Sequence, residues 1–180
     1  AEVIAPHSIY RSVSLEVAAG VIHDWPYAVR LILDTKLELD VLEVVLKVIN
    51  LGNANFSWTG GLHPYWATQD ILDSELLGLL GSKVEDRFKP ERTLESSEFL
   101  RWSGDPCESL YEAKGALDLR TPSHDLRLEV QGFTHWMIWN PGKTGERLVS
   151  DLEPNDWRRF VCIEPLAVSP PILLSSGESF

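Results

Sequence analysis

Two separated stretches of the sequence carry side chains that could exchange protons. Residues 62–66, LHPYW, set a histidine among bulky apolar and aromatic residues, directly after a double glycine. Residues 160–165, FVCIEP, form an apolar strand-like run that closes with a carboxylate. Histidine and glutamate are common general acids and bases. If the two stretches meet in the fold, His63 and Glu164 could form an acid–base pair.

Each of these residues also has a plainer interpretation. His63 could be a core histidine bonded to backbone, and Glu164 could be a strand-end carboxylate in water. A carboxylate that closes an apolar strand is costly to bury unless it is paired or used. His135 lies in an alternating run that suits a structural strand histidine. The remaining histidines lie in predicted loops and are expected to be solvated: His7, His23 and His124.

Other catalytic signatures do not occur in the sequence. It contains no GxxxxGK[ST], GxGxxG, HExxH or GxSxG pattern, so we expect no cofactor and no metal site. Cys107 and Cys162 form no CxxC pair, and Cys162 is expected to be a buried free thiol in an apolar strand. The seven tryptophans are compatible with stacking on sugars, but tryptophan is also a common core residue.

Short alternating stretches dominate the elements that must position these residues. Residues 29–33 and 36–41 alternate with period two, and a shift of phase at Leu42 predicts a turn or bulge near residues 40–42. Asparagine and glycine in residues 50–55 predict a tight turn. Further strands are expected at 56–59, 98–102, 116–120, 125–130, 135–140 and 157–167. Many short strands separated by Gly and Pro indicate an all-β antiparallel sandwich or barrel.

Three segments fit this pattern less well. Residues 70–77 could form a short helix or a strand followed by a loop. Residues 83–92 are charged, contain a proline and predict an exposed loop. Residues 1–24 show little strand pattern, so we expect one domain over residues 1–180 that is incomplete at its N-terminus.

Length and charge limit the class of protein. A chain of 180 residues can bury a core as one domain. Its formal net charge of −11 argues against binding to nucleic acid or to anionic membranes. No apolar run approaches the ~18 residues of a membrane span. We therefore expect a cytoplasmic monomer with a small-molecule ligand.

Five motifs in order resemble the hexose-6-phosphate mutarotase branch of the aldose 1-epimerase (galactose mutarotase-like) superfamily. They are WPY at residues 25–27, NLG at 50–52, LHPYW at 62–66, WNPG at 139–142 and CIEP at 162–165. The resemblance covers about residues 25 to 178. It implies the antiparallel β-sandwich of the galactose mutarotase-like (supersandwich) type. The family has more chain, mostly N-terminal, which carries further phosphate contacts.

The resemblance also implies roles for individual residues. His63 corresponds to the catalytic acid and Glu164 to the catalytic base. Glu108, in ESLY, matches the sugar-binding aspartate of a DRxY-like stretch without its arginine, and Asp105 is a second candidate. Arg11, in HSIYR, corresponds to the phosphate-binding arginine of an HGxAR-like segment. Trp139 and Asn140 of WNPG are expected to contact the sugar.

The expected function is an isomerase of carbohydrate metabolism that interconverts the α and β anomers of a hexose 6-phosphate, with glucose 6-phosphate as the first choice. The alternative is a non-catalytic carbohydrate-binding module on the same fold, which the altered DRxY-like and HGxAR-like stretches favour. A third interpretation is a structural sandwich in which both residues are incidental. Geometry separates these hypotheses, since catalysis is favoured if His63 and Glu164 face one cleft with room for a pyranose between them, and fails if they lie on opposite faces.

Overall fold

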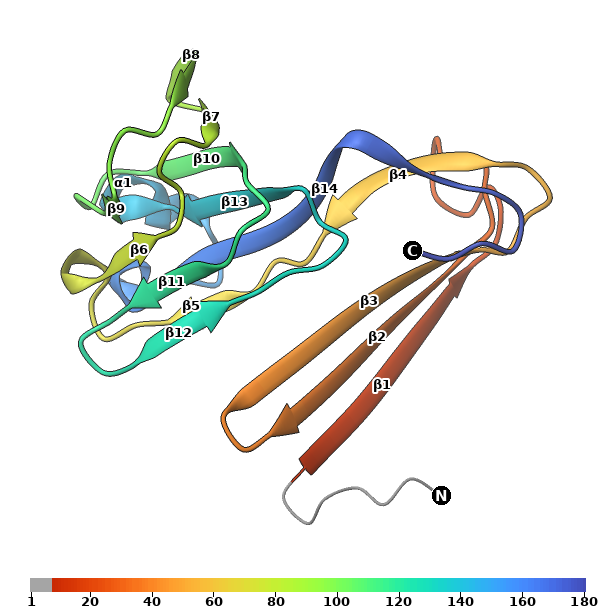
Figure 1. Ribbon diagram of the computed structural model, residues 1–180, viewed down its shortest axis with the longest axis horizontal. Coiled ribbons are helices and arrows are strands. Elements are labelled where there is room, and N and C mark those ends of the chain that lie inside the picture. The colour runs from red at the N-terminus through yellow and green to blue at the C-terminus, as the bar shows by residue number, and fades with distance from the viewer. Residues whose placement is uncertain (1–7) are drawn as a thin grey trace. The chain divides into compact units, whose positions relative to one another are not determined.

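The computed structural model describes residues 8–180; of Pro90 and Arg92 it describes only the backbone. Two compact units make up the chain, which is built mostly of antiparallel strands (Figure 1). Unit 1 comprises the residues up to Thr59 together with Pro170–Phe180, and unit 2 comprises Gly60–Ser169. The interpretation of residues 1–180 as a single domain stays a prediction.

Unit 1 is built around a three-stranded antiparallel sheet, in the order β1 (Ser8–Val17), β2 (Val29–Glu38), β3 (Val41–Asn50). The prediction of little strand structure in residues 1–24 was wrong, because β1 pairs with β2 over its whole length. Its alternation is masked by polar residues on both faces. One face still repeats apolar residues at Ile9, Val13 and Leu15, all of which are exposed.

The predicted turn near residues 40–42 is confirmed one residue earlier. Leu39 adopts a left-handed conformation with φ of 53°, and the chain reverses there from β2 into β3. Leu37 then pairs with Leu42 and therefore shares a face with it. This pairing explains the shift of phase in the sequence.

The remaining strands of the described residues form two antiparallel sheets, which belong to unit 2 except at residues 56–59 and 170–174, which belong to unit 1. The larger has the order β4-β14-β13-β10-β7-β8, with β5 also paired to β14. The smaller has the order β12-β11-β6-β9. The strands of the larger sheet are β4 (Phe56–Gly61), β5 (Tyr65–Ala67), β7 (Lys83–Asp86), β8 (Lys89–Leu94), β10 (Cys107–Glu112), β13 (His135–Asn140) and β14 (Phe160–Leu174). Those of the smaller are β6 (Glu75–Leu77), β9 (Phe99–Arg101), β11 (Leu117–Arg120) and β12 (Asp125–Leu128).

Short helical segments join some of these strands. They are η1 (Ile71–Asp73), α1 (Gly142–Gly145), η2 (Glu146–Leu148) and η3 (Asp156–Arg159). Residues 70–77 thus combine a helical turn with strand β6, so both alternatives considered for this segment occur. The expectation of a loop at residues 83–92 was wrong, because β7 and β8 pair there as a hairpin. Charged residues surround Val84, the buried residue of β7, so the apolar position of this strand was not recognised in the sequence.

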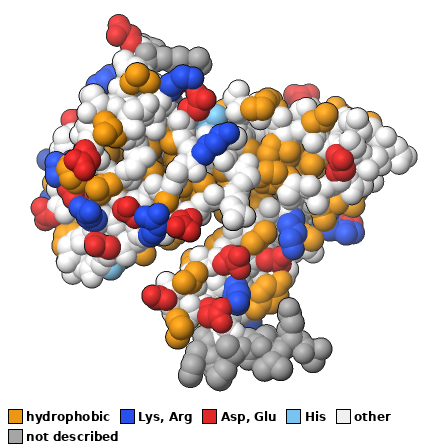
Figure 2. All heavy atoms as spheres, viewed as in Figure 1, with side chains coloured by type: hydrophobic (Ala, Val, Ile, Leu, Met, Phe, Trp, Pro, Cys, Tyr) orange, Lys and Arg blue, Asp and Glu red, His pale blue; other side chains and the backbone are white. Residues whose placement is uncertain are grey.

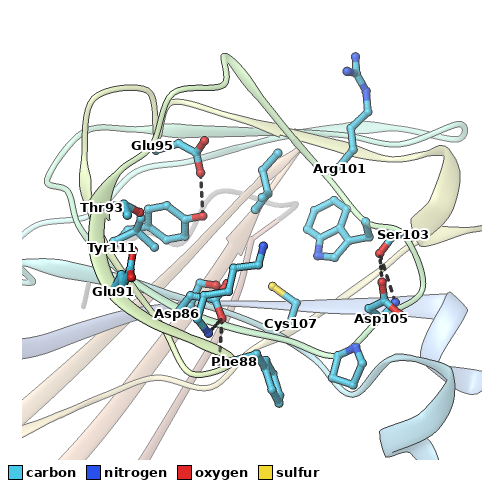
Figure 3. A pocket seen from close by; sticks show the side chains of 16 residues that line it. Asp86, Phe88, Glu91, Thr93, Glu95, Arg101, Ser103, Asp105, Cys107 and Tyr111 are labelled. Atoms are coloured by element: carbon cyan, nitrogen blue, oxygen red, sulfur yellow. Dashed lines mark hydrogen bonds between the residues drawn. The ribbon is translucent and has the colours of Figure 1, made fainter.

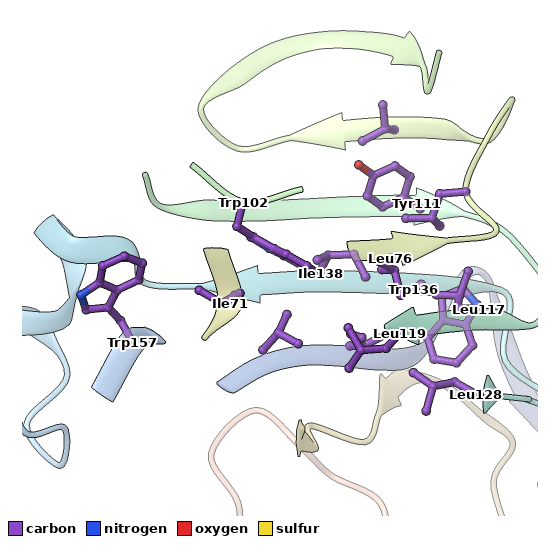
Figure 4. Close-up of a cluster of buried hydrophobic side chains, with 14 residues drawn as sticks. Ile71, Leu76, Trp102, Tyr111, Leu117, Leu119, Leu128, Trp136, Ile138 and Trp157 are labelled. Atoms are coloured by element: carbon purple, nitrogen blue, oxygen red, sulfur yellow. The ribbon is translucent and has the colours of Figure 1, made fainter. Parts of the chain in front are cut away.

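The core of unit 2 lies between its two sheets. Trp136 and Ile138 of β13 and Ile163 of β14 contribute from the larger sheet, and Leu76 and Leu119 from the smaller (Figure 4). Their alternating neighbours on β13 and β14 point to the other face of the larger sheet. That outer face carries the candidate site.

The antiparallel β architecture confirms the predicted fold class. Among the described residues, no helix has the length and apolar character needed to cross a membrane. On the face seen in Figure 2, acidic and basic side chains of the described residues are interspersed, which agrees with an acidic chain that lacks an extended basic surface there.

Candidate acid–base site

The end of β4 approaches β14 closely because residue 61 is a glycine. A Cβ atom at Gly61 would lie 2.0 Å from the carbonyl oxygen of Pro165. The next backbone amide, of Leu62, donates a hydrogen bond to that same oxygen over 3.2 Å. The double glycine of the sequence therefore brings the chain directly beside the residue that follows Glu164.

Strand β5 then holds the histidine loop against β14. Tyr65 pairs with Cys162 and Trp66 pairs with Val161. The indole Nε1 of Trp66 also donates a hydrogen bond to the carbonyl oxygen of Ile163 over 3.2 Å. Because Gly61 and Tyr65 both lie against β14, the loop between them places His63 next to Glu164.

The structure brings His63 and Glu164 into direct contact. Nε2 of His63 lies 3.3 Å from Oε1 of Glu164. The histidine side chain is 53% exposed, whereas the carboxylate side chain is 8% exposed. The pair therefore joins a solvent-facing imidazole to a buried carboxylate, both on the outer face of the larger sheet.

Burial changes the acidity of the carboxyl group. Desolvation raises the pKa of Glu164 above its usual range, the positive charge of protonated His63 lowers it, and the charge of Glu108 raises it further. We take the net direction as upward, because desolvation is the largest of these causes. A carboxylate with a raised pKa is a stronger base, which suits removal of a proton from a hydroxyl group.

Aromatic rings surround the pair. The rings of His63 and Tyr65 stack with centroids 5.2 Å apart and an interplanar angle of 22°. Trp139 meets His63 edge-on at 6.0 Å, and Phe160 lies 4.9 Å from Tyr65. Apolar walls around a few polar groups are typical of small-molecule sites. The predicted position of Trp139 at the site therefore agrees with the geometry.

Glu108 also lies on this face of the sheet. It pairs with Trp139 across β10 and β13, and Trp139 pairs in turn with Cys162 of β14. The sequence offered no arginine beside Glu108, but the fold supplies one from the β7–β8 turn. Nη1 of Arg87 lies 2.7 Å from Oε2 of Glu108.

Asn140 takes a structural role. Its Nδ2 donates hydrogen bonds to the carbonyl oxygens of Trp157 and Phe160, each over 2.9 Å, and its Oδ1 accepts one from the amide of Gly142. The residue is buried on the inner side of the sheet. These contacts fix the start of β14 and leave no exposed polar atom for a sugar, so the expected sugar contact is corrected to a structural one.

Asp105 lies away from the acid–base pair. It accepts a hydrogen bond from the hydroxyl of Ser103 over 2.8 Å, at the edge of an 870 Å³ cavity (Figure 3). Cys107 and Tyr111 also line that cavity, and they alternate along β10 with Glu108. The cavity is therefore on the opposite face of the sheet, and Asp105 is not brought together with His63 and Glu164.

Arg11 belongs to unit 1, on strand β1, and its Nη1 donates a hydrogen bond to the carbonyl oxygen of Tyr10 over 2.9 Å. Its expected contact with a phosphate stays a prediction. Among the other histidines, His135 is a buried residue of β13 beside Thr134, as expected for a structural role. His7 lies outside the described residues.

Cys162 adds a sulfur atom to the cluster. The thiol, a nitrogen of His63 and a carboxylate oxygen of Glu164 lie within 4.8 Å of one another, and three such donors can in principle hold a metal ion. Burial strongly raises the pKa of the Cys162 thiol, because desolvation disfavours the charged thiolate. The cluster is thus a histidine–glutamate pair beside a neutral thiol. The expectation of a buried free thiol is confirmed.

Tyr65, Phe160 and Arg87 lie at the site but were not predicted. Tyr65 stands two positions after His63 in the same aromatic stretch, so period-two alternation could have identified it. Arg87 lies in a segment that was expected to be a loop, and only the pairing of β7 with β10 brings it opposite Glu108.

Comparison with known proteins identifies the family of the chain. The family described as aldose 1-epimerase matches residues 3–180. A protein of Cenchrus ciliaris named "Putative glucose-6-phosphate 1-epimerase" is 24% identical over 162 residues, which cover 88% of this chain and 49% of that protein. The chain thus spans about half the length of this curated relative.

Solved structures share the fold. The crystal structure of a "putative mutarotase (YeaD)" from Salmonella typhimurium matches with a TM-score of 0.84 at 17% identity, over 96% of this chain and 58% of the other. A "galactose mutarotase related enzyme" from Lactobacillus acidophilus matches with a TM-score of 0.74 at 16% identity, over 99% of this chain and 67% of the other. At these identities the likeness shows the fold alone.

Proposed function

The chain belongs to the aldose 1-epimerase family, and from that premise we propose that it interconverts the α and β anomers of an aldose, with a hexose 6-phosphate such as glucose 6-phosphate as substrate. The observation that carries the proposal is the contact of 3.3 Å between His63 and Glu164. The phosphate is suggested by the motifs of the sequence and by the name of the Cenchrus ciliaris relative.

The reaction needs two proton transfers. Glu164, as a carboxylate, removes the proton of the anomeric hydroxyl while protonated His63 donates a proton to the ring oxygen. The C1–O5 bond breaks, the aldehyde rotates about C1–C2, and the ring oxygen attacks its other face. On closure Glu164 returns its proton to the new anomeric oxygen and His63 recovers its own. Protons and electrons balance without any cofactor.

The contact between His63 and Glu164 also determines which side chain has to move when a sugar binds. A sugar can lie between the two groups only if the imidazole leaves the carboxylate. Its ring belongs to a loop and is about half exposed, whereas Glu164 is buried in the middle of a long strand. His63 is therefore the mobile partner, and Tyr65 and Trp139 provide the aromatic surface against which it moves.

The test is anomeric exchange measured by NMR or polarimetry on glucose and glucose 6-phosphate side by side. Glu164→Gln should lower the rate by on the order of 10²–10⁴, because it removes a proton-transfer group. Glu112→Gln is the matched control, since Glu112 is an exposed glutamate of the same sheet. An undiminished rate in Glu164→Gln would rule out this mechanism. Binding of sugar without exchange by the unaltered chain would favour a carbohydrate-binding module.

A further inference from the structure

Arg87 is a charged residue of the site face to which the acid–base mechanism gives no role. It occupies the turn between β7 and β8, and it contacts Glu108 twice. Its backbone amide donates a hydrogen bond to the Glu108 carbonyl oxygen over 2.9 Å, and its guanidinium lies 2.7 Å from the Glu108 carboxylate. Two attachments between the same residues fix both the turn and the direction of the side chain.

The turn itself is shaped for this contact. Oδ1 of Asp86 accepts hydrogen bonds from the backbone amides of Phe88 and Lys89, over 2.8 and 3.2 Å. An aspartate that caps its own turn in this way holds the following residues in a defined conformation. Arg87 therefore belongs to a turn of defined conformation.

Glu108 needs such a partner because of where it stands. It is 28% exposed and shares the face of Glu164, whose pKa its negative charge raises. An unpaired Glu108 carboxylate would rotate freely, and its uncompensated negative charge would raise the pKa of Glu164. A guanidinium binds a carboxylate in a defined orientation and offsets its charge.

Several titratable or charged groups face the same region. They are Lys83 and Glu85 of β7, Arg87 of the turn, Glu108 and Glu112 of β10, His135 of β13, Cys162 and Glu164 of β14, Tyr65 of β5, and His63 and Asp151 from loops. Lys83 lies 3.0 Å from Glu112. Glu108 thus has its own cation in Arg87, distinct from the neighbouring Lys83–Glu112 pair.

We propose that Arg87 is a positioning residue of the sugar site, which holds the Glu108 carboxylate in one orientation as an acceptor for substrate hydroxyl groups and offsets its charge beside Glu164. The inference rests on the proposed function. It adds a residue from a hairpin that neither the motifs nor the comparisons assign.

Two readouts test the role of Arg87. In Arg87→Ala, loss of the fixed hydroxyl acceptor should raise KM by on the order of tenfold, with kcat less affected. The acid limb of the kcat/KM profile should move to higher pH, since the uncompensated charge of Glu108 holds the proton on Glu164. Glu108→Gln should move that limb in the opposite direction, to lower pH. Arg87→Lys should restore the position of the limb but only part of the KM.

Lys83→Ala is the matched control, because Lys83 makes the same kind of exposed ion pair on the same hairpin. It should leave both KM and the acid limb unchanged. An Arg87→Ala variant with the KM and pH profile of the unaltered protein would overturn the inference, as would equal effects of Arg87→Ala and Lys83→Ala. Failure of the proposed function is a separate result, since it would appear as full activity in Glu164→Gln.

Discussion

At the scale of single residues, the buried position of Glu164 makes opposite demands on activity and stability. A base with a raised pKa accepts a proton readily, but its ionised form is held in a site that disfavours charge. The partner that lowers this cost is His63, which is itself about half exposed. The proposed role of Glu164 as a base therefore needs the ionised carboxylate, whereas burial in the folded state favours the protonated form.

The pH dependence of activity follows from this burial. The folded pKa of Glu164 is raised above its ordinary value of 4.5, so the base is ionised only at correspondingly higher pH. We expect the acid limb of kcat/KM to lie above pH 4.5, because the ionised carboxylate is the proposed base. Exchange rates over a pH series would measure this limb. An acid limb at or below the ordinary glutamate value would contradict the assignment.

The stability of the protein should respond with the opposite sign. Between the unfolded and the raised folded pKa of Glu164, the native state binds more protons than the unfolded state, so this group's contribution to stability falls as pH rises. Glutamine carries no charge. We expect Glu164→Gln to melt a few degrees above the unaltered protein at pH 8, with the difference shrinking toward pH 4. Thermal unfolding by circular dichroism would show it, and a lower melting temperature at pH 8 would refute it.

At the scale of elements, the site depends on how closely β4 can run beside β14. The backbone at Gly61 leaves no room for a side chain, and the amide that follows it bonds to the carbonyl of Pro165. Asn140 performs a related task from the other side, because its amide group bonds to the carbonyl of Phe160 at the start of β14. The geometry of the proposed acid–base pair thus depends on contacts that involve neither the His63 nor the Glu164 side chain.

Gly61→Ala tests this dependence. Its Cβ would force the strands apart, which should cost about 1–3 kcal/mol of unfolding free energy, as overpacking typically does. It should also lower kcat, because His63 would be displaced from Glu164. Gly115→Ala is the matched control, since a Cβ there meets no atom within 4 Å. Denaturant unfolding and exchange rates of both variants measure the effect, and equal behaviour would show that the close approach is not required.

The sequence predicted those elements whose apolar pattern was clear and missed those whose charges concealed it. The limits of β13 were predicted to the residue, because its continuous apolar run ends at a clear turn signal, Pro141 and Gly142. Strands β1, β7, β8 and β10 were missed, since polar residues occupy both of their faces. His63 and Glu164 could be predicted from motifs, whereas the contact of Arg87 with Glu108 depends on the pairing of strands that are distant in sequence.

At the scale of the whole molecule, the proposed chemistry lies within unit 2, but the arginine expected to bind phosphate lies in unit 1. His63, Glu164, Trp139 and Glu108 all belong to Gly60–Ser169. Arg11 belongs to β1. Sugar recognition and phosphate recognition can therefore be tested independently.

Arg11→Ala should separate the two substrates. If Arg11 binds the phosphate, its loss should raise KM for glucose 6-phosphate by on the order of tenfold and leave KM for glucose unchanged, because only the former loses a charge-assisted hydrogen bond. Arg30→Ala is the control, since Arg30 is a cation of the same sheet that pairs with Glu16. Equal effects of Arg11→Ala on both substrates, or no effect on either, would remove Arg11 from the phosphate site.

The thiol beside the base has a consequence for how the site withstands oxidants. Peroxides and alkylating agents attack the thiolate, and the buried Cys162 is held as the unreactive thiol. Covalent damage at this position therefore has to wait until β14 opens locally and exposes it. The rate at which a thiol reagent labels Cys162 therefore reports how often β14, the strand that carries Glu164, opens locally.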